Sequence, residues 1–275
     1  MLKIKGRGSK DKLLGSLVGF AIGDSMGATT EFMSSEEIKE KYGEVNDLIG
    51  GGWLNLKSGE VTDDTQMMLC IIEAIYSSNT LEDFKENCMD NFSEWLKTTK
   101  DVGNGCRKAI INWNANRTYT GKNKEEGNGG IMRCLPFALL IDTRANIEQL
   151  KLTHNNHIVE RSLVMYLNQM YYFLNDKGSC YISNELQPPL GHSVNTVHNS
   201  IYWSNSETFR EGIIGAVNHG GDADTIAALS GSLLGAKFGY ENIPKEWIDK
   251  LDPKVMKELL NFYDYICSDS YRFFS

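Results

Sequence analysis

The chain has 275 residues, of which 41% are hydrophobic and 23% are charged, and this composition excludes disordered and fibrous proteins. Its formal net charge of −8 argues against a generic nucleic-acid-binding surface, which would need a basic stripe. A small anionic ligand is not excluded, because a metal ion or a helix N-terminus supplies positive potential locally. No repeat, low-complexity tract or change of composition marks a boundary, so we expect one domain over residues 1–275.

Six cysteines are scattered along the chain without a Cys-x-x-Cys pair, and most lie among apolar residues. We therefore expect buried free thiols rather than disulfides or a zinc site. The apolar run 13–22 contains two glycines and leads straight into Asp24, so it is too short to span a bilayer and lacks a cleavage signal. These features favour a cytoplasmic protein without a membrane segment, and we expect it to be a monomer.

Hydrophobic residues recur at helical spacing along most of the chain, and alternating strand patterns are almost absent. Ser34 and Glu37 form a capping-box pattern for a short helix, and Thr80 is the expected N-cap of a long amphipathic helix through Trp95. Pro136 is expected to kink its helix or to lie in its first turns. Further helices are predicted at 11–22, 64–78, 106–114, 131–141, 146–153, 155–175, 194–203, 207–217, 222–238, 245–250 and 253–266. The predicted fold class is all-α, with glycine-rich loops at 43–59 and 115–130.

Two loop-to-helix junctions carry hydroxyl and paired carboxylate groups. Residues 220–225 read Gly-Gly-Asp-Ala-Asp-Thr before a helix of small residues, and residues 61–65 read Val-Thr-Asp-Asp-Thr before an apolar helix. Either junction alone is typical of a capped helix start. Paired acids destabilise each other without a cation, however, and oxygen-only ligand sets suit hard cations such as Mg²⁺ or Mn²⁺. We therefore expect the two junctions to face one another across a cleft.

Three further segments combine glycine with polar residues: 23–32 (Gly-Asp-Ser-Met-Gly-Ala-Thr-Thr-Glu-Phe), the turn at 101–104, and 127–133 (Gly-Asn-Gly-Gly-Ile-Met-Arg). Taken in order with the two junctions, these motifs resemble those of the ADP-ribosylglycohydrolases of the dinitrogenase-reductase-activating glycohydrolase type. The resemblance spans residues 23–239. It implies an all-α domain of orthogonal helices, with a centre of two Mg²⁺ or Mn²⁺ ions at the bottom of a cleft.

The resemblance also implies roles for individual residues. Glu31 and Asp101 match acids that lie near the metals or act in catalysis. The implied metal ligands are Thr62, Asp63, Asp64, Asp222, Asp224 and Thr225. The residues that would bind the ADP-ribosyl group are Asn104, Gly127, Asn128, Gly129, Gly130, Met132, His154 and His192.

The chain departs from the family pattern at two places. His192 stands where many members have a tyrosine, although an imidazole can still stack on a base or a ribose. The loop 116–126 is long and charged, and we expect it to shape recognition of the leaving group.

The implied activity is metal-dependent removal of ADP-ribose from a modified protein side chain, with an arginine linkage favoured, or from a related small substrate. Two cations would supply the counter-charge that a diphosphate needs in an acidic protein, and carboxylates suit the oxocarbenium-like charge of ribosyl hydrolysis. Glu31 or Asp101 would help to activate water at the anomeric carbon, and the sequence leaves open which of them is the main acid or base.

Some of these residues could instead have purely structural roles. Asp101 would then only cap the helix that begins near Asn104, and His154 would make a structural hydrogen bond. The whole chain could also be a catalytically silent member of the fold that binds ADP-ribose or has a structural role. An all-α nucleotide pyrophosphohydrolase is a third reading, but such enzymes usually present acids at Glu-x-x-Glu or Glu-x-x-Asp spacing, which these junctions lack.

Overall fold

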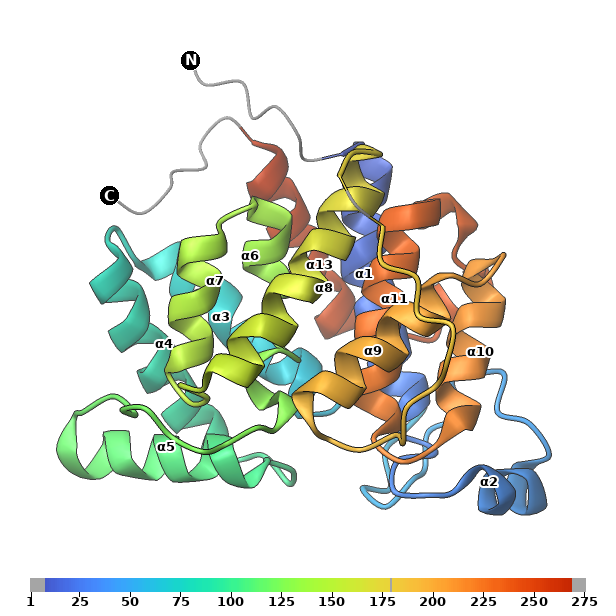
Figure 1. Cartoon of the computed structure of the whole chain (residues 1–275), viewed down its shortest axis with the longest axis horizontal. Helices are drawn as coiled ribbons and strands as arrows, with labels where there is room; N and C mark the ends of the chain where they lie inside the picture. The colour runs from blue at the N-terminus through green and yellow to red at the C-terminus, as the bar shows by residue number, and fades with distance from the viewer. Residues whose placement is uncertain (1–7, 179, 269–275) are drawn as a thin grey trace.

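The structure is a computed structural model that describes residues 8–178 and 180–268, and within these residues the chain is helical (Figure 1). The β-type pairings in that part of the chain are two isolated bridges, Gly51–Leu56 and Gly127–His192. The all-α prediction is therefore confirmed. Among the described residues, no helix has the length and apolar character needed to cross a membrane.

Figure 1 shows the helices arranged around a central pair, α1 (Lys10–Gly27) and α11 (Ala223–Phe238). On one side lie α3 (Asp63–Ser77), α4 (Leu81–Leu96), α5 (Asn104–Asn116), α6 (Leu135–Leu140) and α7 (Thr143–Lys151), and on the other α9 (Ser193–Ser204) and α10 (Phe209–His219), with α2 (Ser35–Tyr42) against α10. The remaining elements are α8 (His157–Asn175), which joins the two sides, α13 (Pro253–Cys267), which packs on α1, α12 (Lys245–Ile248), and the 3₁₀ turns η1 (Asn128–Gly130) and η2 (Tyr240–Asn242).

The central pair packs closely enough that its two backbones touch. A Cβ atom on Gly19 would lie 2.3 Å from the carbonyl oxygen of Gly231, and one on Gly23 would lie 2.0 Å from that of Ala227. A Cβ on Gly27 would lie 2.5 Å from the carbonyl oxygen of Ala223. Because later residues of α1 meet earlier residues of α11, the helices are antiparallel. The C-terminal end of α1 therefore lies beside the N-terminal end of α11.

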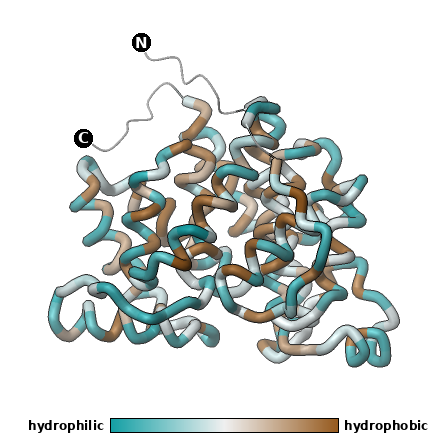
Figure 2. The backbone as a smooth tube through the Cα atoms, viewed as in Figure 1, coloured by the Kyte–Doolittle hydropathy of each residue, from teal (hydrophilic) through white to brown (hydrophobic). Residues whose placement is uncertain are grey.

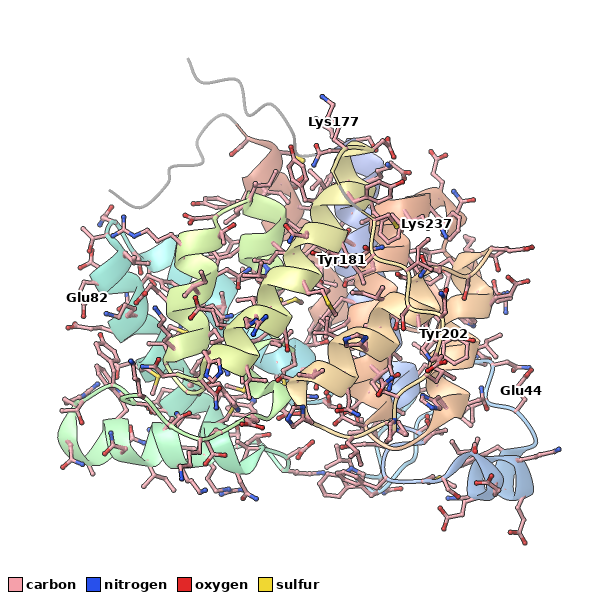
Figure 3. The ribbon with its side chains drawn as sticks, in the orientation of Figure 1. Glu44, Glu82, Lys177, Tyr181, Tyr202 and Lys237 are labelled. Carbon is pink, nitrogen blue, oxygen red and sulfur yellow. The ribbon has the colours of Figure 1, made fainter. Side chains whose placement is uncertain are left out.

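One hydrophobic core runs through the helices, and its buried side chains come from nearly every element. Figure 2 shows hydrophobic segments along the helices in the middle of the molecule and more hydrophilic ones around α2 and α5 at its edge. In Figure 3 the side chains fill the spaces between the ribbons, so the two sides pack as one body. All six cysteines are free thiols, as expected.

Several predicted helix starts are confirmed by hydrogen bonds. Ser34 and Glu37 form the expected capping box of α2, and Thr80 caps α4 in a second box with Asp83. Thr62 caps α3, because its hydroxyl accepts the N–H of Asp64.

Two predicted boundaries were wrong in ways that matter for the site. The first helix continues five residues beyond Ile22 to Gly27, so Asp24 is helical and fully buried. The helix predicted at 131–141 begins only at Leu135, with Pro136 in its first turn, and residues 131–133 form a turn that follows η1.

Gly19→Ala tests the contact between the central helices. In an exposed helix this change would stabilise by up to about 1 kcal/mol. Here the new methyl group would meet the Gly231 carbonyl, so we expect the free energy of unfolding to fall by about 1–3 kcal/mol in urea titrations. Gly121→Ala is the control, because a Cβ there meets nothing within 4 Å. Equal midpoints for both variants and the parent would contradict the close packing.

Candidate active site

Four helix ends and one 3₁₀ turn meet at a cavity of about 290 Å³. The segment after α1 contributes Glu31 and Phe32, the N-terminal ends of α3, α5 and α11 contribute the aspartates and Asn104, and the loop before η1 contributes Glu125. Of the residues assigned from the sequence, those that line this cavity are Glu31, Asp63, Asp64, Asp101, Asn104, Gly127, Asn128, Gly129, Met132, His154, Asp222, Asp224 and Thr225. The two junctions therefore meet, as the sequence predicted.

The acids form two overlapping groups of possible ligands. One oxygen each from Asp63, Asp64 and Asp224 lie within 4.8 Å of one another, and so do oxygens from Glu31, Asp101 and Asp224. Asp224 belongs to both groups. The Oδ1 atom of Asp64 is buried and has no hydrogen-bond partner, which is costly for a polar atom. An all-oxygen set with an unsatisfied buried oxygen fits a hard divalent cation.

Burial raises the pKa of these acids. Desolvation, followed by repulsion from neighbouring carboxylates, raises the pKa values of Asp63, Asp64 and Asp224 well above their usual range. Desolvation also raises the pKa of Glu31 to about 8 and that of Asp222 to about 6. So many carboxyl groups cannot all ionise together unless a cation compensates them.

The start of α3 is held in place by Asp24, which the sequence analysis left without a role. One carboxylate oxygen of Asp24 accepts the N–H and the hydroxyl of Thr62, at 3.0 and 2.8 Å, and the other accepts the N–H of Thr65 at 3.0 Å. Thr62 itself lies outside the main cavity and lines a neighbouring one. Its oxygen is 3.5 Å from Asp64 Oδ2, and the hydroxyl of Thr225 donates to the same atom at 3.3 Å.

Asp222 occupies the N-cap position of α11 but does not cap it. Its carboxylate instead accepts a hydrogen bond of 2.6 Å from Asn128, whose amide also donates to Thr196 at 3.1 Å. The capped-helix interpretation is therefore wrong for Asp222, because its side chain bonds across the cavity to η1. Asp101 does not cap α5 either, since that helix has Gly103 at its N-cap and no side-chain cap.

Glu31 lines both this cavity and a second hollow, which Phe32 and Trp53 also line. Its Oε2 accepts a 2.5 Å hydrogen bond from the indole N–H of Trp53, and the rings of Trp53 and Phe32 are 5.5 Å apart. Phe32 has a φ of 63°, a left-handed conformation that is unusual for an aromatic residue. Its N–H donates to the carbonyl of Gly221 at 2.7 Å, and the Gly221 N–H donates to Met33 at 2.8 Å. These two bonds join the Glu31 segment to the α11 junction.

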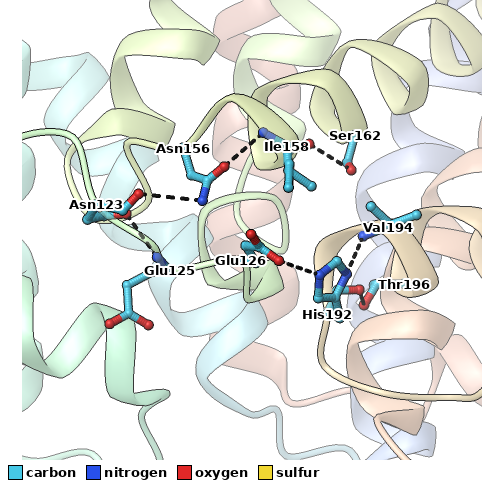
Figure 4. Close-up of polar contacts among 9 residues, drawn as sticks. All are labelled: Asn123, Glu125, Glu126, Asn156, Ile158, Ser162, His192, Val194 and Thr196. Carbon is cyan, nitrogen blue, oxygen red and sulfur yellow. Dashed lines mark hydrogen bonds and ion pairs between the residues drawn. The ribbon is translucent and has the colours of Figure 1, made fainter.

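His192 and Gly130 are the other assigned residues that do not line the main cavity. Figure 4 shows that both ring nitrogens of His192 are engaged: Nδ1 accepts the N–H of Val194 at 3.3 Å and Nε2 lies 3.0 Å from Glu126. His192 thus caps α9 and fastens the charged loop to it. The Gly127–His192 bridge beside these contacts strengthens the attachment. A stacking role for this ring stays a prediction.

His154 is buried and its pKa is lowered to about 3, first by desolvation and then by the nearby charge of Arg133. Its Nδ1 lies 2.7 Å from the hydroxyl of Thr153. The structural hydrogen bond that the sequence left open is therefore present, and His154 also lines the cavity.

The sequence analysis missed four polar partners of the site: Asp24, Trp53, Thr196 and Arg133. Asp24 and Arg133 lie inside the recognised motifs, so a buried charge within a motif was an available signal for both. Trp53 lies in a loop without periodicity, and Thr196 lies in a predicted helix whose pattern does not distinguish it from its neighbours.

The raised pKa values predict how stability changes with pH without metal. An acid whose pKa is higher in the folded state binds its proton more tightly there, so its stabilising contribution is present at low pH and is lost as pH rises. In EDTA we expect the free energy of unfolding to decrease between about pH 4 and about pH 8, as Asp222 and then Glu31 ionise. Added Mg²⁺ or Mn²⁺ should reverse the loss, most strongly at the high-pH end, in urea titrations. A stability that rises over this interval in EDTA would contradict the coupling.

Comparison with known proteins gives a consistent result. The family model for ADP-ribosylglycohydrolase matches residues 6–167 and 160–270. An ADP-ribosyl-[dinitrogen reductase] glycohydrolase of Rhodospirillum rubrum is 36% identical over 90% of this chain and 93% of its own length. An ADP-ribosylarginine hydrolase of Serratia proteamaculans is 29% identical over 88% of this chain and 76% of its own.

A solved structure of an ADP-ribosylglycohydrolase-related protein complex superposes with a TM-score of 0.76 at 24% identity, covering 95% of this chain and 99% of that one, and so shares its fold. The resemblance predicted from the motifs is confirmed, and with it the assignment to a class of hydrolases. This chain belongs to the ADP-ribosylglycohydrolase family.

Proposed function

We propose that the protein is a metal-dependent hydrolase that removes ADP-ribose from modified arginine side chains of proteins. The observation that carries the proposal is that two sets of three acids, Asp63–Asp64–Asp224 and Glu31–Asp101–Asp224, lie in one cavity and have Asp224 in common. Two adjacent groups around a shared ligand favour two divalent ions. We choose arginine because the Serratia relative is named an ADP-ribosylarginine hydrolase, whose scissile bond would join the ribose to a guanidine nitrogen. We also propose that the protein acts in the cytoplasm, because its cysteine pattern and its short apolar run favour that location, and that it is a monomer.

The residues that would hold the ions are Asp63, Asp64, Asp222, Asp224, Thr62 and Thr225. Divalent ions in such a site supply counter-charge for a diphosphate and orient a ribose diol. The unsatisfied Oδ1 of Asp64 supports this assignment, and so does Asp222, whose carboxylate lines the cavity and does not cap α11.

Glu31 and Asp101 would carry the proton transfers. Water attacks the anomeric carbon while the bond from that carbon to the guanidine nitrogen breaks, so the water loses one proton and the leaving nitrogen gains one. A carboxylate beside the anomeric carbon stabilises the positive charge that develops there and accepts the proton. Desolvation raises the pKa of both acids, and that of Glu31 to about 8, which suits Glu31 for proton exchange near neutral pH.

Because Glu31 and Asp101 also belong to one of the possible ligand groups, their role needs a separating experiment. We expect Asp101→Asn to lower the release of ADP-ribose from an ADP-ribosylated arginine protein by about 100-fold or more. Mn²⁺ titration calorimetry on the same variant then distinguishes the roles. Unchanged stoichiometry and affinity assign Asp101 to proton transfer, whereas loss of an ion makes it a ligand. Asp249→Asn is the control, since that residue is exposed, pairs with Lys245 and does not line the cavity. Full activity in Asp101→Asn would remove Asp101 from the mechanism.

The linkage is tested with arginine-, serine- and DNA-linked ADP-ribose, each with Mg²⁺, Mn²⁺ or EDTA. We expect release from the arginine linkage, dependent on metal and abolished by EDTA. Preferred release from another linkage would correct the substrate. Binding of ADP-ribose without release under any condition would replace the enzyme by the catalytically silent binding protein considered above.

A further inference from the structure

A chain of hydrogen bonds lies behind the cavity wall and begins at Arg133. This residue is fully buried, and no acidic side chain pairs with it among the described residues. Its guanidinium donates to the carbonyl of Gly129 at 2.5 Å, to the side chain of Gln149 at 3.0 Å and to the hydroxyl of Thr153 at 2.8 Å. A charged group buried in this way has a strong requirement for fixed acceptors. The oxygen of Thr153 is therefore held as an acceptor of Arg133.

The hydroxyl proton of Thr153 must then point elsewhere. The acceptor at hand is Nδ1 of His154, 2.7 Å away, and the rival is the thiol sulfur of Cys106, which is a weak acceptor. The positive charge of the Arg133 guanidinium, which contacts Thr153, favours a lone pair rather than an N–H group on the imidazole nitrogen nearest to it, Nδ1. Both effects make Nδ1 the unprotonated nitrogen. Since the low pKa keeps the ring neutral, its single proton must sit on Nε2.

Nε2 of His154 faces the cavity. Cβ atoms on Gly105 and Gly129 would lie 2.8 and 3.5 Å from it, and one on Gly127 would lie 3.6 Å from it, and all three glycines line the cavity. No hydrogen bond to Nε2 occurs within the described part of the chain, where the ring's one partner is Thr153. The buried ring thus presents an unused N–H donor to a ligand.

We propose that Arg133 and Thr153 are positioning residues that hold His154 as the neutral Nε2–H tautomer, so that it donates to a phosphate oxygen of the bound ADP-ribosyl group. The inference rests on the proposed function for the identity of the ligand. Two features favour an anionic acceptor. The charge of Arg133 reaches His154, and the N-terminus of α5 at Gly103 and Asn104 has no side-chain cap and opens on the same cavity. The diphosphate is the anionic part of ADP-ribose.

The tautomer is measured on the Mg²⁺-loaded protein by long-range ¹H–¹⁵N correlation spectra of its five histidines, with His154→Gln to assign the signal. We expect the Nε2–H pattern in the parent and in Thr153→Ser, which keeps the hydroxyl. Thr153→Val keeps the shape but removes the hydroxyl, so a second, Nδ1–H population should appear. An Nδ1–H pattern in the parent, or identical spectra for Thr153→Val and Thr153→Ser, would overturn the relay.

Calorimetry with ADP-ribose and with adenosine tests the acceptor. We expect Thr153→Val to weaken ADP-ribose binding about tenfold, equal to about 1.4 kcal/mol, and to leave adenosine binding unchanged relative to Thr153→Ser. Equal weakening of both ligands would overturn the phosphate assignment. The tautomer result stands whether or not the protein releases ADP-ribose from arginine, so failure of the proposed function and failure of this inference give different results.

Discussion

The contact between α1 and α11 is the constraint on which the rest of the structure depends. Gly19 and Gly231 bring the two backbones together so closely that no Cβ fits between them. Because the helices are antiparallel, the contact also fixes which ends coincide. Asp24, in the last turn of α1, and Asp224, in the first turn of α11, therefore reach the same end of the pair. The glycines bury little apolar surface themselves, and their contribution is to set this geometry.

The position of Asp24 transmits the geometry to α3. A fully buried carboxylate that accepts three hydrogen bonds from Thr62 and Thr65 leaves the first turn of α3 little freedom. Asp63 and Asp64 are then placed against Asp224, although like charges repel and burial raises their pKa values. Packing of the helix pair thus supports an arrangement of acids that is unfavourable by itself, as functional sites often require. The same packing explains why these acids cannot all ionise together without a compensating cation.

The sequence predicted the parts of this arrangement that have a local signature. Helical periodicity, the capping box of α2, the N-cap of α4 and the two acidic junctions were visible in short windows, and the junctions were expected to face each other because paired acids need a common cation. Contacts that join distant segments had no such signature. Trp53 contacts Glu31 from a loop without periodicity, and Arg133 contacts Thr153 from the turn at 131–133, which the apolar sequence predicted to be helical. His192 was expected to stack on the ligand, which stays a prediction, whereas the contacts of its ring nitrogens with Val194 and Glu126 had no sequence signal.

Helix capping connects the local and the distant levels. Every described helix of eight or more residues has a side-chain cap except α5 and α11. These two helices open on the cavity, and the lack of an N-cap side chain costs a helix about 1 kcal/mol, although in the first turn of α11 the carboxylate of Asp224 accepts the N–H of Thr225 at 2.8 Å. At α11 the carboxylate of Asp222 turns instead to Asn128, and at α5 Gly103 offers no side chain at all. The start of α5 therefore presents backbone N–H donors to the cavity, and the acids present oxygens to it, at some cost in local stability. A ligand with a diphosphate would accept hydrogen bonds from these donors. If the same ligand carries a diol, the diol would bind cations held by the acids.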